Sequence, residues 1–448
     1  LHIYDSIFNQ KEMQHILVRH EQGATHAADG YARATGKPGV VLVTSGPGAT
    51  NAITGIATAF MDSIPMVIIS GQVQSHLIGT DAFQETDMIG VSRPIVKHSF
   101  TVDKQENIAN IVAEAFHIAT SGRQGPVLID VPKDLTNPDD LFDFVYPDKV
   151  YIRSYNPPTK PENHQVSRAV DAILASERPV IYAGGGTISS NASKELRELN
   201  DLIDAPVTNT LMGLGVFPGT HKRFLGMLGM HGTYQANMAM HNADLIIALG
   251  ARFDDRITNA PDKFAPRAKV IHFDVDHSSV SKIIEADIAV FGQIKDSLQA
   301  INNHLRTKID EIDKEKLAPW HQQISDWKEK HGLNHDLYKT EDDSAPILPQ
   351  AAIQHIYQES QGKAFVTSDV GQHQMFAAQY YHFDKPRKWI NSGGLGTMGF
   401  GLPSAMGVKL AYPDEEVICI TGEGSIQMCI QELSTCSQYK LPIKIFNI

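Results

Sequence analysis

The sequence predicts an α/β fold made of three parallel-sheet domains. Short apolar runs typical of buried strands alternate with amphipathic helical stretches along the chain, and this alternation is typical of parallel α/β domains. Glycine-rich loops directly follow several of the apolar runs. Parallel sheets bind ligands at the carboxyl ends of their strands, where such loops lie. We therefore expect three consecutive domains with ligand sites at their strand ends.

The first predicted domain covers residues 1–150 and contains a βαβ unit. Its alanine-rich first helix ends just before Pro38, because proline cannot continue a helix. A linker over residues 151–165 is indicated by its prolines, which disfavour both helix and central strand. In this domain we expect helices over residues 21–35 and 51–62 and strands over residues 40–44, 66–70 and 127–130.

A central domain is predicted over residues 166–306, with a glycine turn after its first strand that is typical of nucleotide-type folds. A charged stretch, 307–344, is interpreted as a helical connector. The third domain covers residues 345–448. In these two domains we expect strands over residues 179–182, 245–249, 270–273, 364–367, 417–420 and 443–448.

The composition restricts the class of partner. Of the 448 residues, 42% are hydrophobic and 20% are charged, and the formal net charge is −12. This acidic balance argues against a surface for nucleic acid or anionic membrane, since both need clustered lysine and arginine. No apolar run approaches the ~18 residues that a membrane span needs. Small metabolites are therefore the expected partners.

Cysteine usage indicates the compartment. Cys419, Cys429 and Cys436 lack the paired spacing of a zinc site or a disulfide framework, so we expect buried thiols in a reducing, cytoplasmic environment. Because the sequence begins with Leu1 and not with methionine, an organellar transit peptide is left open.

Two motifs of the first domain lie next to predicted helix starts. Glu21 begins a helix among small residues that leave room for a ring, although a glutamate there is often a surface residue that compensates the helix dipole. Residues 45–51 form a glycine loop between strand and helix, the placement of a ligand-approaching loop or simply of a tight turn.

Further candidates follow strands of the first and central domains. The loop 80–87 carries Phe83 and Gln84, and Lys133 follows the strand 127–130. In the central domain, Met230 lies in the segment 229–232, and Arg252 and Arg256 follow the strand 245–249. An arginine at a strand end can bind a carboxylate or phosphate. The alternatives are ordinary surface residues and a solvated ion-pair cluster around Asp254 and Asp255.

The third domain combines two glycine loops with an acidic turn. Residues 369–374 follow the first strand, residues 393–401 contain Met398 among glycines, and Glu423 lies in a Gly-Glu-Gly turn. An acid can hold Mg²⁺, and helix N-terminal amides can bind phosphate. The combination favours a cofactor site over three unrelated turns.

In this order the motifs resemble the catalytic large subunits of the acetohydroxyacid synthase (acetolactate synthase) family, which uses thiamine diphosphate. The resemblance spans the whole chain. It implies that two thiamine-diphosphate-binding-type domains flank a central domain associated with FAD. The matching residues are 20–23, 28–35, 45–51, 80–85, 97–100, 227–232, 250–256, 395–401 and 422–428.

The resemblance also implies residue roles. Glu21 is expected to bind the aminopyrimidine ring, Met398 to hold the cofactor bent, Glu423 to bind Mg²⁺ and Arg256 to bind a substrate carboxylate. The other residues expected to line the substrate channel are Phe83, Gln84, Lys133 and Met230. Those expected to contact thiamine diphosphate are Gly371, Gln372, His373, Gly396, Gly422, Gly424 and Ser425, and those expected to contact FAD are Gly184, Gly185, Gly186 and Arg252.

The activity implied by the resemblance is decarboxylation of pyruvate and addition of the hydroxyethyl carbanion to pyruvate or 2-oxobutyrate, the first common step of branched-chain amino-acid biosynthesis. A homodimer or larger homo-oligomer and a small regulatory subunit are implied as partners. Three departures stand out: Glu423 replaces the usual aspartate, Gln293 stands where an aspartate is expected near FAD, and both ends of the family's pattern are absent. We therefore expect a fragment that is weakly active alone.

Two alternative functions stay open. The chain could be a related thiamine diphosphate enzyme, such as a pyruvate oxidase or another carboligase, against which Arg256 and the Phe83–Gln84 loop argue. It could also be a non-catalytic FAD-binding or scaffold homologue with a decayed cofactor site, as Glu423 suggests.

Overall fold

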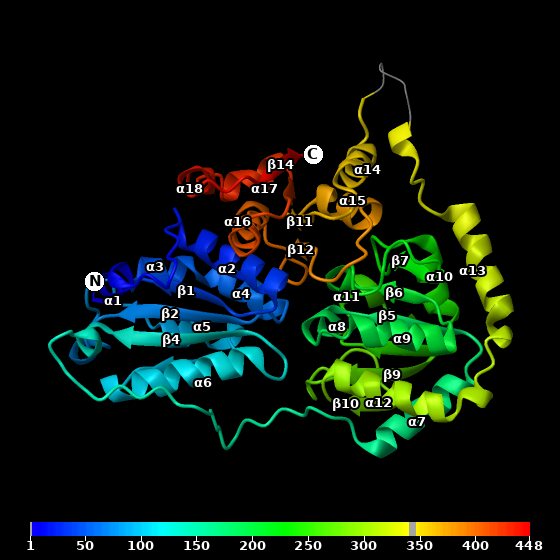
Figure 1. Ribbon diagram of the computed structural model, residues 1–448, viewed down its shortest axis with the longest axis horizontal. Coiled ribbons are helices and arrows are strands. Elements are labelled where there is room, and N and C mark those ends of the chain that lie inside the picture. Colours follow the sequence, from blue (N-terminus) through cyan, green and yellow to red (C-terminus); the bar gives the residue numbers. More distant parts are fainter. Residues whose placement is uncertain (1, 340–345) are drawn as a thin grey trace. The chain divides into compact units, whose positions relative to one another are not determined.

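The computed structural model describes residues 2–339 and 346–448 (Figure 1). It contains three sheets, with strand orders β1-β2-β4-β3, β10-β9-β8-β5-β6-β7 and β12-β11-β13-β14, and every pairing with a defined register is parallel. The predicted α/β class with three parallel sheets is confirmed. Among the described residues, no helix has both the length and the apolar character of a membrane span.

The chain folds into two compact units. The first contains the chain up to Asn156, Phe365–Gly371 and Ile390–Ile448, and the second contains Pro157–Ala364 and Gln372–Trp389. Two sheets therefore belong largely to the first unit and one to the second. The proposed boundary between the connector and the third domain lies at residues 344–345, outside the described residues.

The first sheet carries apolar residues on both faces, as parallel sheets require. Met66, Ile68 and Leu128 pack with helices on one face, and Val67 and Val127 pack against α6 on the other. The strands are β1 (Gly39–Val43), β2 (Met66–Gln72), β3 (His98–Thr101) and β4 (Pro126–Pro132), and the helices are α1 (His2–Asn9), α2 (Glu21–Thr35), α3 (Pro47–Asn51), α4 (Ile53–Met61), α5 (Met88–Ser92) and α6 (Ile108–Thr120).

The predicted helix over residues 51–62 is divided. Helical structure already begins at Pro47, which occupies the first turn of α3, where its missing N–H is not needed. Gly46 makes the preceding turn with a φ of +64°, a conformation that favours glycine. The chain then passes from α3 to α4 at Ala52. The loop that we expected at residues 45–51 is thus a turn followed by a short helix.

The second sheet has two apolar cores on its opposite faces. Its strands are β5 (Pro179–Ala183), β6 (Val207–Asn209), β7 (Phe224–Met227), β8 (Leu245–Leu249), β9 (Lys269–Asp274) and β10 (Ile288–Phe291). The helices of this unit are α7 (Asn163–Ala175), α8 (Gly185–Ser189), α9 (Ser193–Ile203), α10 (Tyr234–Asn242), α11 (Asp255–Thr258), α12 (Ile294–Thr307), α13 (Ala318–His331), α14 (Pro349–Ser360) and α15 (Gln372–Tyr380).

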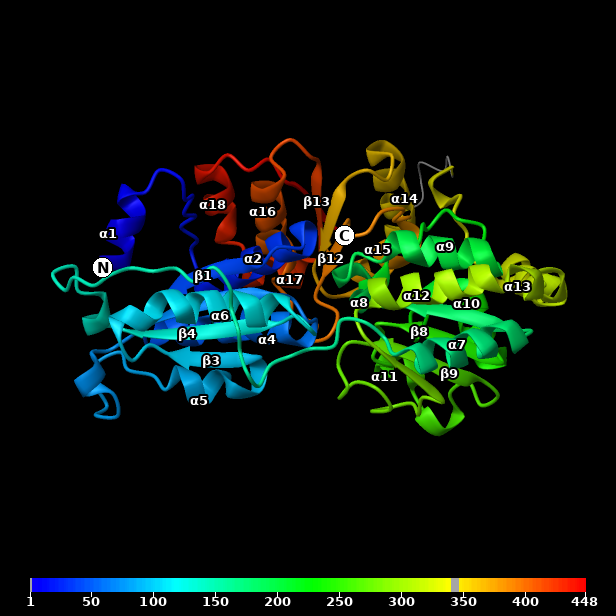
Figure 2. The ribbon, with the colours of Figure 1, turned by 60° about the horizontal axis from the view of Figure 1, so that its bottom comes forward.

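The third sheet packs against α16, which in turn contacts α2 of the same unit. Figures 1 and 2 both show α16 beside α2. Two glycines permit this approach, because a Cβ at Gly30 would lie 2.2 Å from the Ser404 carbonyl oxygen and one at Gly407 would lie 1.8 Å from that of Ala27. The elements are β11 (Phe365–Ser368), β12 (Trp389–Asn391), β13 (Val417–Thr421), β14 (Lys444–Asn447), α16 (Gly401–Ala411), α17 (Glu423–Met428) and α18 (Glu432–Gln438).

Candidate active site

The loops after β11 and β13 are tied together at the carboxyl edge of the third sheet. The buried carboxylate of Asp369 accepts hydrogen bonds from the Gly401 N–H at 3.0 Å and from the Thr421 hydroxyl at 2.7 Å. The Ser425 hydroxyl donates to the Val370 carbonyl at 3.1 Å. The turn that carries Glu423 is therefore fixed beside the turn that leads to Gly371.

Met398 reaches this edge from a third loop. Gly396 and Gly399 flank it with φ angles of +69° and +86°, so the backbone turns on both sides of Met398. Its side chain is 40% exposed. A Cβ built at Gly424 would lie 3.4 Å from the Met398 Cε atom. The structure thus places the Met398 side chain against the turn Gly422-Glu423-Gly424. The glycines of this turn have no side chains that would fill the space a ligand needs.

Glu423 is the first residue of α17 and its side chain is exposed. Within the described ranges, no group of three or more His, Cys, Asp or Glu side chains forms a metal cluster. A cation at Glu423 would therefore need further oxygen ligands from water or a bound anion, which is how Mg²⁺ is commonly held. Gln372 and His373 lie next to the turn at Gly371, at the start of α15.

Glu21 is held at the start of α2. The Asn51 side-chain amide donates to its Oε2 atom at 3.0 Å, and a Cβ at Gly48 would lie 3.3 Å from its Oε1 atom. His20 caps the helix by accepting the Gln22 N–H at its Nδ1 atom. Glu21 therefore faces the 45–51 segment, where small residues leave space beside its carboxylate.

The other candidates of the first sheet lie at its strand ends. Gln84 has a φ of +60° and its backbone lies against Gly46, whose Cβ would be 2.8 Å from the Gln84 carbonyl oxygen. Phe83 is 90% exposed, and Lys133 is also exposed. The Ser75 N–H donates to Asp134 at 2.8 Å, which ties the start of this loop region to the chain after β4.

The glycine turns of the central sheet lie at its topological switch point. β5 has β6 on one side and β8 on the other. The loops that follow β5 and β8 begin at Gly184 and Gly250. The Gly184 N–H bonds to Leu249 and the Gly186 N–H bonds to Gly250. Open parallel sheets bind ligands at such a point. At the end of β6, where Asn209 pairs with Ala183 of β5, the buried amide of Asn209 and the Thr210 hydroxyl lack a hydrogen-bond partner.

Met230 and Arg256 are brought together in this unit, because the Met230 N–H donates to the Arg256 carbonyl at 2.8 Å. Arg252 pairs with Asp254 at 3.1 Å, as the ion-pair alternative expected. The Arg256 side chain is 70% exposed and lies 3.7 Å from Asp255, so its guanidinium is accessible to an anion. Gln293 accepts a hydrogen bond from Ser190 at 3.2 Å, directly after α8.

The sequence did not indicate that Glu432 supports the start of α2. Its carboxylate is fully buried and accepts the N–H groups of Arg19 and His20, both at 3.1 Å. The sequence also did not indicate the role of Asp62, whose carboxylate accepts hydrogen bonds from the loop that carries Met398. Both partners lie hundreds of residues away, so no local spacing could have revealed these contacts.

Three family models match the chain: the thiamine pyrophosphate enzyme N-terminal TPP binding domain over residues 1–91, the central domain over residues 166–301 and the C-terminal TPP binding domain over residues 369–448. Fold and site therefore define a thiamine diphosphate enzyme, as the resemblance implied.

Relatives of high sequence identity show to which family of thiamine diphosphate enzymes the chain belongs. The acetolactate synthase isozyme 3 large subunit of Escherichia coli is 54% identical over 448 residues, which is 100% of this chain and 77% of the relative. An acetolactate synthase large subunit of Buchnera aphidicola is 60% identical with the same coverage, and that of Cyanidium caldarium is 48% identical over 457 residues, 100% of this chain and 76% of the relative. The chain belongs to the acetolactate synthase large-subunit family, whose enzymes depend on thiamine diphosphate.

Proposed function

We propose that this protein converts two molecules of pyruvate into acetolactate and carbon dioxide, and that 2-oxobutyrate can replace the second pyruvate. The observation that carries the proposal is the meeting of three loops at the third sheet, with Met398 lying over Gly424 beside Glu423. Glycine at positions 396, 399, 422 and 424 leaves space there for a cofactor. The names of the relatives supply the reaction class.

Thiamine diphosphate, when bound, supplies a nucleophilic carbon and an electron sink for decarboxylation. The residues present suit it. Glu21 would hold a proton at its carboxyl group against the aminopyrimidine ring, with Asn51 orienting the carboxylate. Met398 would support the bent conformation of the cofactor. The diphosphate would be held by the turns that contain Gly371, Gln372, His373, Gly396, Gly422, Gly424 and Ser425.

We propose Mg²⁺ as the metal and Glu423 as its side-chain ligand. A carboxylate is the hard oxygen donor that Mg²⁺ prefers, and the exposed position of Glu423 leaves room for waters and diphosphate oxygens. The side chain is one methylene longer than aspartate, so the cation would lie farther from the backbone than an aspartate would place it.

FAD is proposed for the central sheet, in a structural role. Gly184, Gly185 and Gly186 lie at the switch point, and Arg252 follows β8 at the same edge. The buried polar atoms of Asn209 and Thr210 that lack partners suit a polar ligand, since buried polar groups are nearly always hydrogen-bonded.

For the substrates, we propose that Arg256 binds the carboxylate of the second 2-oxoacid as a bidentate cation. Phe83, Gln84, Lys133 and Met230 would line the approach, and the exposed side chains of Phe83 and Met230 suit contact with a small ligand. A homodimer or larger oligomer and a small regulatory subunit are part of the proposal, because relatives are named large subunits.

The proposed domain division is 1–150, 166–306 and 345–448, with a linker over residues 151–165 and a connector over residues 307–344. Limited proteolysis is expected to cut first within the linker and the connector.

The experiment is acetolactate formation from pyruvate, with thiamine diphosphate, Mg²⁺ and FAD each omitted in turn. We expect Arg256→Gln to raise the KM for the 2-oxoacid, while Arg306→Gln, an exposed arginine in α12, leaves the KM unchanged. Acetyl phosphate or another product in place of acetolactate would favour a related thiamine diphosphate enzyme. Absence of thiamine diphosphate binding would favour the scaffold alternative.

A further inference from the structure

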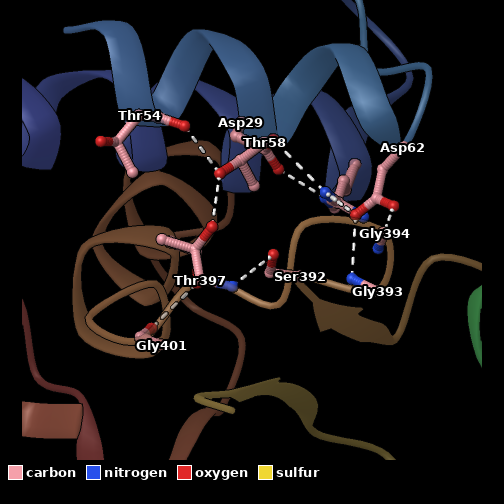
Figure 3. A network of polar contacts seen from close by, with 11 residues as sticks. Asp29, Thr54, Thr58, Asp62, Ser392, Gly393, Gly394, Thr397 and Gly401 are labelled. Carbon is pink, nitrogen blue, oxygen red and sulfur yellow. Dashed lines mark hydrogen bonds and ion pairs between the residues drawn. The ribbon is translucent and has the colours of Figure 1, made fainter.

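Asp62 joins the end of α4 to the loop that carries Met398. The Gly393 N–H donates to its Oδ2 atom at 3.0 Å and the Gly394 N–H donates to its Oδ1 atom at 2.7 Å (Figure 3). The carboxylate is 1% exposed. Both oxygens of one buried carboxylate are thus used to hold two successive peptide groups of the loop.

Arg33 is a further hydrogen-bond donor to the Asp62 carboxylate. It directs its Nε and Nη2 atoms at Asp29, and Nη2 also donates to Asp62 at 2.9 Å. Burial alone would lower the pKa of Arg33, but Asp29 and Asp62 outweigh burial and raise that pKa above its ordinary value. Since one guanidinium serves two buried carboxylates, Asp62 needs more donors, and the loop provides them.

A second anchor holds the other end of the loop. The Thr58 hydroxyl, one turn before Asp62 in α4, donates to the Thr54 carbonyl at 2.9 Å, so at the 2.7 Å contact between hydroxyls Thr397 is the donor. The Thr397 N–H donates to the Ser392 hydroxyl at 3.0 Å. Thr397 is therefore fixed by its side chain and by its backbone (Figure 3).

These anchors determine where Met398 points. Thr397 is 8% exposed because its side chain is turned toward α4, whereas the next residue, Met398, is 40% exposed and lies against Gly424. The backbone turns at Gly396 and Gly399, with positive φ angles on either side, have no side chains of their own to hold the conformation. The loop therefore depends on contacts from α4.

We propose that Thr58 and Asp62 are positioning residues for Met398: through Thr397, Gly393 and Gly394, α4 holds the loop in the conformation that presents Met398 to the cofactor. The inference rests on the proposed binding of thiamine diphosphate at this edge. Thr58 and Asp62 are not among the residues that we propose to contact the cofactor or the substrate. Their effect passes through the loop, and the role of α4 is to keep Met398 in place before the cofactor arrives.

The test compares Thr58→Val, which removes the acceptor for Thr397, with Thr58→Ser, which keeps it. Thr54→Val, an exposed threonine one turn earlier in α4, is the control. In the cofactor-free protein, we expect faster deuterium uptake in a peptide covering residues 392–400 for Thr58→Val alone. In the loaded protein, we expect exchange of the thiazolium C2 proton to slow by about tenfold to a hundredfold, with Thr58→Ser close to wild type.

Asp62→Asn is the second variant, because it keeps one acceptor oxygen but loses the ion pair with Arg33. It is expected to speed deuterium uptake at Gly393 and Gly394 in the same way. Unchanged uptake and unchanged C2 exchange in Thr58→Val would overturn the positioning role. If the wild-type protein itself fails to bind thiamine diphosphate, the proposed function fails instead, and the uptake measurement still tests the anchors.

Discussion

The carboxylate of Glu432 accepts the backbone N–H of His20 at 3.1 Å, immediately before the residue that begins α2, Glu21. The same carboxylate accepts the Arg19 N–H at 3.1 Å and the Thr435 hydroxyl at 2.7 Å. It is fully buried, and no side-chain cation is among these partners. Two backbone amides and one hydroxyl therefore satisfy the buried carboxylate, and in return Glu432 fixes the chain where it enters α2.

Replacing Glu432 tests this relationship. Glu432→Ala is expected to destabilise the protein by roughly 3 kcal/mol, because buried N–H groups would lose their acceptor, and to weaken thiamine diphosphate binding through displacement of Glu21. Urea denaturation and titration with the cofactor measure the two effects. Ser434→Ala, which removes only an exposed contact to the Arg19 side chain, should stay within about 0.5 kcal/mol of wild type. Equal stability of Glu432→Ala and wild type would contradict the prediction.

A second prediction concerns the contribution of the close contact between α2 and α16 to the stability of the protein. Gly407→Ala would place a methyl group 1.8 Å from the Ala27 carbonyl oxygen, so the two helices would have to separate. We expect a loss of about 3 kcal/mol or more, typical of forced overpacking between backbones. Thermal denaturation is the measurement. Gly71→Ala is the control, since its nearest atom would be 3.4 Å away, and a similar loss in both variants would show that the helix contact is not the cause.

Asp130 should make the stability depend on pH. Burial raises the pKa of Asp130 to about 6, and hydrogen bonds from Gln72 and Ser70 only partly oppose it. Since the aspartate pKa in unfolded chains is about 4, the fold favours the neutral form, and stability is lost as the pH rises from about 4 through about 6. Asp130→Asn should therefore stabilise the protein at pH 8 by about 3 kcal/mol and have little effect at pH 4.

Melting curves of wild type and Asp130→Asn across this pH range check the prediction. Asp139→Asn, an exposed aspartate after the same strand, is the control and should follow the wild type at every pH. A stabilisation by Asp130→Asn that is the same at pH 4 and pH 8 would exclude ionisation of Asp130 as its cause.

Much of the fold could be predicted because the buried strands are continuous apolar runs. The predicted strand 245–249 coincides with β8, whose five residues are all buried. The predicted helix 21–35 coincides with α2, which ends at Thr35 and is followed by the cap residue Gly36 with a φ of +74°. Short strands such as β6 and β12, of three residues each, were not predicted, because three residues give no measurable periodicity.

The candidate site was predictable only where its residues lie in local motifs. The Met398 loop and the Glu423 turn each have a glycine pattern that can be read from the sequence. The contact between Asp62 and Gly393 joins residues 331 positions apart, and that between His20 and Glu432 joins residues 412 apart. Such contacts arise because the fold brings the end of α4 to the loop that carries Met398 and the start of α2 to α18, which no local pattern encodes.

The proposed metal ligand gives the last prediction. Glu423→Gln keeps the shape of the side chain but removes its negative charge, so the half-saturating Mg²⁺ concentration for thiamine diphosphate binding should rise by at least about tenfold. Glu423→Asp keeps the charge and should bind Mg²⁺ at least as well as wild type. Because the side chain is exposed, neither variant should change the melting temperature of the ligand-free protein. Glu359→Gln, at an exposed position of α14, controls for loss of charge alone. Mg²⁺ dependence that is identical in wild type and Glu423→Gln would remove Glu423 from the metal site and leave water and diphosphate oxygens as the expected ligands.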